Sequence, residues 1–180
     1  NNIIINTIPI LPKQMVKIIA DKYVAGQSIN DAINKTEYIN SQNYEVTIDL
    51  LGEHVKELSE VNNITNIYLE LLEKIYEKNL KSNISVKPTH IGLDINRDTF
   101  RDNAFKLVEK ANRLNNFIRF DMENSFTTDA TIKTFKEIQN NYKNVGTVFQ
   151  AYLKRTFSDL ENLMDRKINF RLCKGIYNEN

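Results

Sequence analysis

The sequence predicts an α/β fold in which a parallel sheet is built from about five strand–helix units. From Tyr44 onward, stretches with apolar residues at every second position are followed by stretches with the three-and-four spacing of an amphipathic helix. No hairpin signal or low-complexity tract interrupts this alternation. Such a succession indicates parallel strands joined by right-handed crossovers. The periodicity does not separate a barrel from an open doubly wound sheet.

Composition restricts the class of protein. The chain has 180 residues, of which 41% are hydrophobic and 26% charged, as expected for one soluble globular domain. With 24 Lys and Arg against 23 Asp and Glu, the net charge of +1 predicts no bulk attraction to nucleic acid. One cysteine excludes an internal disulfide and fits a reducing compartment. No stretch approaches the roughly 18 to 20 apolar residues of a membrane span, and no signal peptide is recognisable.

Two helices are expected in an N-terminal helical segment, residues 1–43. The first carries a stripe that begins at Met15 and ends near Gly26, and the second is capped by Ser28. Residues 44–180 then form the strand–helix units. Strands are expected at 44–50, 83–89, 116–122, 145–151 and 169–177. Buried helical stripes are expected at 61–75 and 104–114, followed by a helix capped by Asp129 and a short helix capped by Ser158.

The strand faces turned away from the helices are unusually polar. They carry Thr47 and Asp49, Ser85 and Lys87, Arg119 and Asp121, Val148 and Gln150, and Arg171 and Cys173. Branched aliphatic residues would fill a purely structural barrel interior. Buried unpaired charge is costly, so these groups must pair with one another or with a ligand. A salt-bridge network that plugs the barrel is the structural alternative to a binding site.

The carboxyl ends of the strands favour the binding site. Lys87, Asp121, Gln150 and Lys174 each lie at or next to such an end, where parallel α/β folds bind their ligands. The last strand adds Gly175, beside which a phosphate-bearing cofactor would sit well. His54 and His90 lack the spacing of metal ligands, Cys173 has no evident base partner, and no Walker A or G-x-G-x-x-G loop occurs.

Five segments, in this order and spacing, resemble the proline dehydrogenase family. They are LLGE (50–53), SVKPTHIGL (85–93), FDME (120–123), VGTVFQAYLKR (145–155) and RLCKGIY (171–177). Residues 23–26 resemble the start of the monofunctional bacterial form, so the similarity spans nearly the whole chain. Pro88, Cys173 and Ile176 depart from the residues more usual in the family.

The resemblance implies an FAD-dependent (β/α)8 barrel of the TIM type that oxidises L-proline to Δ1-pyrroline-5-carboxylate and passes electrons to a quinone. It implies catalytic roles for Asp121 and Arg171, with Arg171 near the flavin N5. It implies flavin contacts for Met122, Gln150, Lys174, Gly175 and Ile176, and substrate contacts for Lys87 and Tyr177. A cytoplasmic location with peripheral contact to the inner membrane is the matching expectation.

Five strands are fewer than the eight of that barrel, so we expect this chain to represent the N-terminal part of the fold, with poor activity in isolation. An open sheet edge would favour self-association. Two rival hypotheses are a non-catalytic partial barrel that serves as an assembly module, and another (β/α)8 enzyme that binds a phosphorylated substrate at Lys174 and Gly175. A bound yellow flavin would distinguish an FAD-dependent proline dehydrogenase from both rivals.

Overall fold

A computed structural model describes residues 23–177 of the protein. Within this range one sheet has the strand order β1-β2-β3-β4-β5, and every neighbouring pair is parallel. The strands are β1 (Val46–Asp49), β2 (Ser82–Val86), β3 (Ile118–Phe120), β4 (Val145–Gln150) and β5 (Asn169–Cys173). The predicted succession of parallel strands is confirmed. The helix expected before Gly26 falls almost entirely on residues outside the described range.

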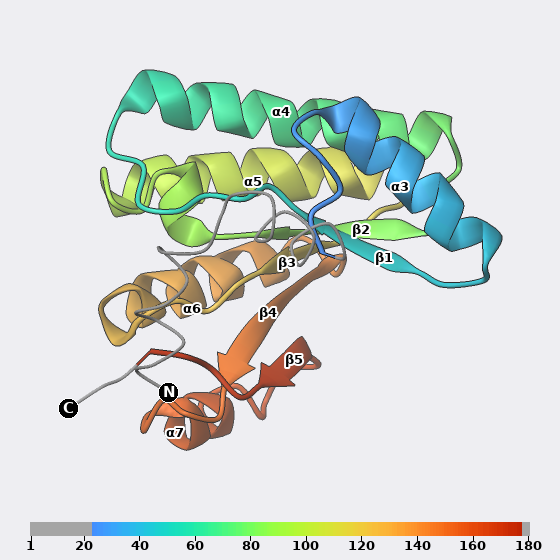
Figure 1. The fold of residues 1–180 in the computed structure, drawn as a ribbon. Coiled ribbons are helices and arrows are strands. Elements are labelled where there is room, and N and C mark those ends of the chain that lie inside the picture. Colours follow the sequence, from blue (N-terminus) through green and yellow to red (C-terminus); the bar gives the residue numbers. More distant parts are fainter. Residues whose placement is uncertain (1–22, 178–180) are drawn as a thin grey trace, which may run out of the picture.

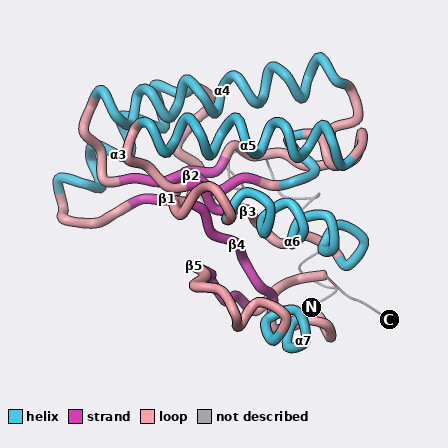
Figure 2. The backbone as a smooth tube through the Cα atoms, turned by 180° about the vertical axis from the view of Figure 1, so that it is seen from behind, coloured by secondary structure: helices cyan, strands magenta, loops and turns pink. Residues whose placement is uncertain are grey.

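Helices cover one face of this sheet. They are α3 (Ile29–Ser41), α4 (Leu58–Glu77), α5 (Arg97–Arg113), α6 (Ser125–Gln139) and α7 (Thr156–Glu161), with a 3-10 helix, η2 (Pro88–Ile91). Helices α4 and α5 lie side by side along β1 to β3, while β4 and β5 turn away with α7 beside them (Figures 1 and 2). The sheet is therefore curled into a half-barrel, which decides between the two architectures that periodicity left open. Among the described residues, no helix combines the length and the apolar character of a membrane span.

The main core lies between the sheet and helices α4 and α5. Tyr68 and Leu72 of α4 are fully buried, as the predicted stripe requires. Phe100 at the start of α5 meets Phe120 of β3 edge to face, with ring centroids 5.9 Å apart. A second apolar cluster beside α7 contains Met122, Val148, Phe149 and Leu163. These two clusters fix where the carboxyl ends of the strands lie.

The second strand ends earlier than predicted. We expected it to run to Thr89, but β2 ends at Val86 and η2 begins at Pro88. Proline has no N–H for a sheet hydrogen bond, whereas its fixed φ suits the first turn of a helix. The turn at Pro88 therefore places Lys87 at the rim of the sheet rather than within a strand.

Helix starts show one correct cap and two wrong ones. Ser28 caps α3 in a capping box, as predicted. Asp129 does not cap α6, because Asn124 does so by accepting a hydrogen bond from Phe126 N at 3.0 Å. Ser158 lies inside α7, and its hydroxyl donates to the carbonyl oxygen of the residue before the helix. Both caps were predicted from the first residues of the apolar periodicity. In α6 and α7 the backbone helix begins several residues before that periodicity does.

Candidate functional site

Charged side chains from four strands meet on the concave face of the sheet, at the carboxyl ends of the strands. Lys87 Nζ lies 2.8 Å from Asp49 Oδ2, which links β1 to the end of β2. Asp121, directly after β3, accepts a hydrogen bond from Ser85 Oγ at 2.6 Å. Its Oδ1 also lies 3.1 Å from Arg171 NH2 on β5. Residues far apart in sequence, which the alternation placed on this face, thus form one polar cluster.

The cluster contains charges of both signs. Lys87 pairs with Asp49 and Arg171 pairs with Asp121, while Arg119 on β3 bonds to Asn169 at the start of β5. Burial and the nearby Arg171 charge lower the pKa of Arg119. Burial alone would lower the pKa of Lys87, but the hydrogen bond and charge of Asp49 outweigh it and raise that pKa. The face therefore presents both positive and negative groups to a ligand.

A tight contact joins β4 to the segment after β5. The Gln150 amide nitrogen donates to the Met122 carbonyl oxygen, while Gln150 Oε1 is buried and has no partner among the described residues. Gly175 has a φ of +87°, and a Cβ built on it would lie 2.4 Å from Gln150 Oε1. Only glycine fits here without displacing the glutamine. The backbone of the segment after β5 therefore lies directly against Gln150.

The other residues of this last segment have different surroundings. The side chains of Lys174 and Ile176 are exposed and do not reach the polar cluster. Tyr177 is half-buried and packs beside the apolar cluster that contains Met122. Burial, with the nearby carboxylates of the site, raises the pKa of Tyr177 to about 12, so its hydroxyl stays protonated near neutral pH. Of the residues predicted for the site, Lys87, Asp121 and Arg171 meet in the polar cluster. Met122 and Tyr177 lie in the apolar cluster beside it, and only the side chains of Lys174 and Ile176 are exposed away from both.

Two features of the site fit the flavin that the motifs imply. The buried Gln150 Oε1 is an acceptor without a donor, and a flavin ring carries an N–H that can supply one. The glycine at 175 leaves its backbone open to close approach. Both groups lie at the carboxyl ends of neighbouring strands, where parallel α/β folds bind cofactors.

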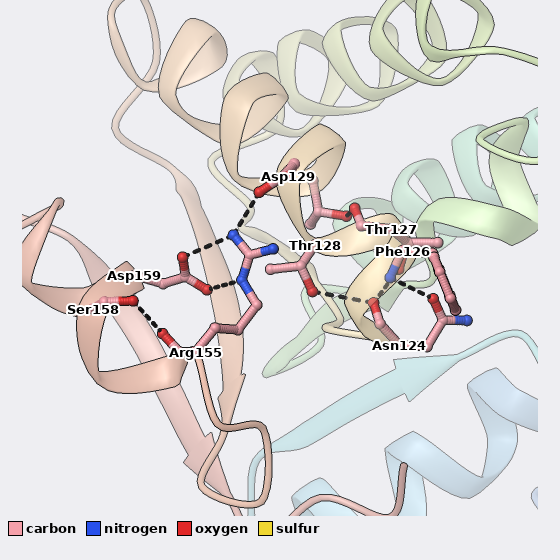
Figure 3. A network of polar contacts seen from close by, with 9 residues as sticks. Asn124, Phe126, Thr127, Thr128, Asp129, Arg155, Ser158 and Asp159 are labelled. Atoms are coloured by element: carbon pink, nitrogen blue, oxygen red, sulfur yellow. Dashed lines mark hydrogen bonds and ion pairs between the residues drawn. The ribbon is translucent and has the colours of Figure 1, made fainter. Parts of the chain in front are cut away.

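An ion-pair network fixes the loop that follows Gln150 (Figure 3). Arg155 donates to Asp159 of α7 at 2.7 Å and to Asp129 of α6 at 2.5 Å. These bonds tie α7 to the first turns of α6. The Thr156 hydroxyl adds a 2.5 Å bond to the Gln150 carbonyl oxygen. The end of β4 is thus held from two sides.

Sequence reasoning gave no role to three residues that the structure joins beside this cluster. Thr89 contacts the buried carboxylate of Glu123 and the backbone of His54. His54, which lacked any partner in the sequence pattern, pairs with Asp94 through Nδ1 at 2.8 Å. Two signals for Glu123 were available, its position after a strand end and its place in the FDME segment. In the described part of the chain no group of His, Cys, Asp or Glu could hold a metal ion.

A hollow of about 880 Å³ opens at the opposite end of the sheet, where β2 and β3 begin. Its lining includes Ser82, Asn116 and Asn144 and none of the charged cluster. The size of this hollow therefore does not make it the preferred site, because ligands of parallel α/β folds bind at the carboxyl ends.

Comparisons with known proteins agree with this placement. Residues 32–180 match the family model of proline dehydrogenase. The chain is 34% identical over 163 residues to proline dehydrogenase 2 of Bacillus subtilis subsp. natto, covering 91% of this chain and 54% of that protein. It is 29% identical over 174 residues to proline dehydrogenase of Deinococcus radiodurans, covering 94% of this chain and 56% of that protein. The chain spans about half the length of the curated relatives it matches.

A solved structure shows a similar fold. Proline utilization A (PutA) from Bdellovibrio bacteriovorus, inactivated by N-propargylglycine, superposes with a TM-score of 0.80 at 25% sequence identity. The match covers 91% of this chain and 21% of that one. The half-barrel described above therefore corresponds to a part of a larger protein in that structure.

Proposed function

The chain belongs to the proline dehydrogenase family, and from this we infer that the protein oxidises L-proline to Δ1-pyrroline-5-carboxylate with FAD. The observation that carries the proposal is the cluster of Lys87, Asp121 and Arg171 at the carboxyl ends of the strands. Proline is a zwitterion with one carboxylate and one secondary ammonium group. A cluster with both signs of charge can bind each end of such a molecule.

Substrate binding is assigned to one cation and two residues near it. Lys87 binds the proline carboxylate. Its ammonium group lies at the rim of the sheet and donates one hydrogen bond to Asp49, which leaves other N–H donors for the substrate. Asp121 lines the proline site and holds Arg171 in place. Tyr177 borders the substrate, and its protonated hydroxyl can donate a hydrogen bond. These contacts would fix the ring carbon next to the proline nitrogen, and errors of an ångström in such placement are expensive.

Cofactor binding is assigned to the end of β3, the end of β4 and the segment after β5. When bound, FAD supplies the acceptor for the hydride that leaves the ring carbon. Met122 and Gln150 would contact its ring system, and Lys174, Gly175 and Ile176 would hold its phosphate-bearing chain. Arg171 would supply a positive charge beside the ring system and would stabilise the negative charge that develops during reduction.

Partners and location follow from the same proposal. The electrons pass to a quinone, which requires contact with a membrane surface, so the protein would work in the cytoplasm and bind the inner membrane peripherally. β5 has no strand on its far side in the described sheet, and Leu172 on it is 57% exposed. This edge would favour self-association.

The test is a visible spectrum of the purified protein with added FAD, followed by L-proline without an electron acceptor. We expect a bound flavin whose absorbance band bleaches on addition of L-proline and not of L-alanine. The 180-residue chain and a form extended to the length of its relatives are compared in parallel. Failure of the extended form to bind FAD would refute the proposal and favour a barrel that uses Lys174 and Gly175 for a phosphorylated substrate.

A further inference from the structure

We propose that Glu123 is a positioning residue, which holds the segment carrying Lys87 and the loop between β1 and α4 in place through Thr89. The inference rests on the proposed function in one respect, namely that Lys87 binds the substrate carboxylate. The contacts themselves join three loops at the carboxyl ends of β1, β2 and β3.

Glu123 is buried as a double acceptor. Glu123 is only 1% exposed and lies two positions after Asp121, on the loop that follows β3. Its carboxylate accepts hydrogen bonds from Thr89 N at 2.9 Å and from the Thr89 hydroxyl at 2.6 Å. Burial raises the pKa of Glu123, and these two bonds oppose that rise. No Lys or Arg forms a salt bridge with it in the described part of the chain.

This arrangement argues against a direct role in chemistry. Both carboxylate oxygens of Glu123 are directed at Thr89, and the residue is closed to solvent. A group that moves a proton must reach the reacting atoms. Burying a carboxylate without a paired cation is unfavourable, and its two charge-assisted bonds offset part of that cost. What Glu123 controls is therefore the position of Thr89.

Thr89 passes the constraint to the loop between β1 and α4. It is fully buried, and its hydroxyl oxygen accepts a hydrogen bond from His54 N at 3.0 Å while donating to Glu123. Its carbonyl oxygen accepts a second one from Val55 N at 3.2 Å. The same loop packs at Gly52 against His90, where a Cβ would lie 2.5 Å from Nε2. The loop is thus held against η2 at residues 52, 54 and 55.

Thr89 also stands two residues after Lys87. Between them lies Pro88, whose φ is fixed by its ring, and the His90 N–H closes the turn on the Lys87 carbonyl oxygen at 3.0 Å. A short, buried turn of this kind moves as a unit. Displacement of Thr89 is therefore transmitted to the Lys87 backbone and from there to its ammonium group.

The experiment uses the full-length flavoprotein with Glu123→Gln. The new amide group directs an N–H at one of the two Thr89 donors, so one bond is replaced by repulsion while size is kept. We expect KM for L-proline to rise about 10-fold, with kcat and the bound flavin spectrum within about twofold of the wild type. Thr89→Val should reproduce this rise and Thr89→Ser should not. Glu73→Gln, on the surface of α4, is the matched control and should leave KM unchanged.

A double variant separates positioning from a general structural effect. In a Lys87→Met background, adding Glu123→Gln should raise KM no further, because the two changes act through the same ammonium group. A rise of equal size in that background, or an unchanged KM in Glu123→Gln alone, would refute the proposal.

Hydrogen exchange distinguishes a failure of the positioning role from a failure of the proposed function. In Glu123→Gln the amides of His54 and Thr89 should exchange faster than in the wild type, whatever the substrate is. Unchanged protection of both amides would refute the positioning role. Lost protection in Glu123→Gln, combined with a wild-type protein that does not oxidise proline, would keep the positioning role and reject the proposed substrate.

Discussion

Replacing Gly175 by alanine tests the cofactor end of the site most directly. The residue has a φ of +87°, a conformation that costs an L-residue about 1–2 kcal/mol. The added Cβ would also lie 2.8 Å from the Cβ of Gln150, closer than real carbon atoms approach. Because Gln150 Cβ is at the root of its side chain, rotation cannot remove this clash. The segment after β5 or the end of β4 must therefore move.

The expected magnitude follows from two contributions. Backbone strain of about 1–2 kcal/mol adds to the loss of the buried Gln150 hydrogen bond to Met122, which contributes about 1 kcal/mol. The apoprotein escapes this cost by moving the segment after β5, whereas FAD binding requires the original arrangement and must restore it. The sum of about 2–3 kcal/mol then weakens FAD binding by about 30- to 150-fold, since each 1.4 kcal/mol is a factor of ten. Titration of the apoprotein with FAD, followed by flavin fluorescence, measures this change in Kd.

Gly26→Ala provides the matched control. Gly26 also has a positive φ, of +155°, and an added Cβ would meet the Asp31 side chain at the start of α3, away from the strand ends. This variant should lower stability without changing the Kd for FAD. A wild-type Kd in Gly175→Ala, or an equal loss in Gly26→Ala, would show that the contact with Gln150 does not shape the cofactor site.

Four further variants test the charged groups. Arg171→Ala should reduce the rate of flavin reduction by L-proline about 100-fold or more, as should Asp121→Ala, with the fold intact by circular dichroism. His54→Ala should lower the free energy of unfolding by less than about 1 kcal/mol. Its pKa is raised by the hydrogen bond to its carboxylate partner, so the contribution is present below pH 6.5 and lost as pH rises through the folded pKa. Arg155→Ala leaves the Asp159 carboxylate, whose side chain is 9% exposed, without its partner, and should cost about 2–3 kcal/mol by urea unfolding.

For each of these variants one outcome would contradict the prediction. Wild-type turnover in either active-site variant would remove that residue from the mechanism. A stability difference for His54→Ala that grows from pH 6 to pH 8 would have the wrong sign for the ion pair with Asp94. Adding Asp159→Ala to Arg155→Ala should restore part of the lost stability, because the unpaired buried carboxylate is then gone. No recovery would show that the loss comes from packing.

The number, order and direction of the strands, and the character of their two faces, follow from sequence patterns alone. Alternation is a local property, so the assignment of Asp121 and Arg171 to the face opposite the helices needed no knowledge of the fold. The buried stripe of α4 and the capping box at Ser28 are local in the same sense. Element ends were less well determined, since Pro88 and Asn124 fix them through backbone geometry and capping rather than periodicity.

Tertiary structure decided the curl of the sheet and the partners of each charge. Periodicity is the same in a barrel and in an open sheet, because both bury the same strand and helix faces. The pairing of Lys87 with Asp49, and of Glu123 with Thr89, joins residues more than 30 positions apart. Such contacts depend on the register and curvature of neighbouring strands, which no local pattern records. The chemistry of the site is therefore present in the sequence as a set of side chains, and the fold sets which of them meet.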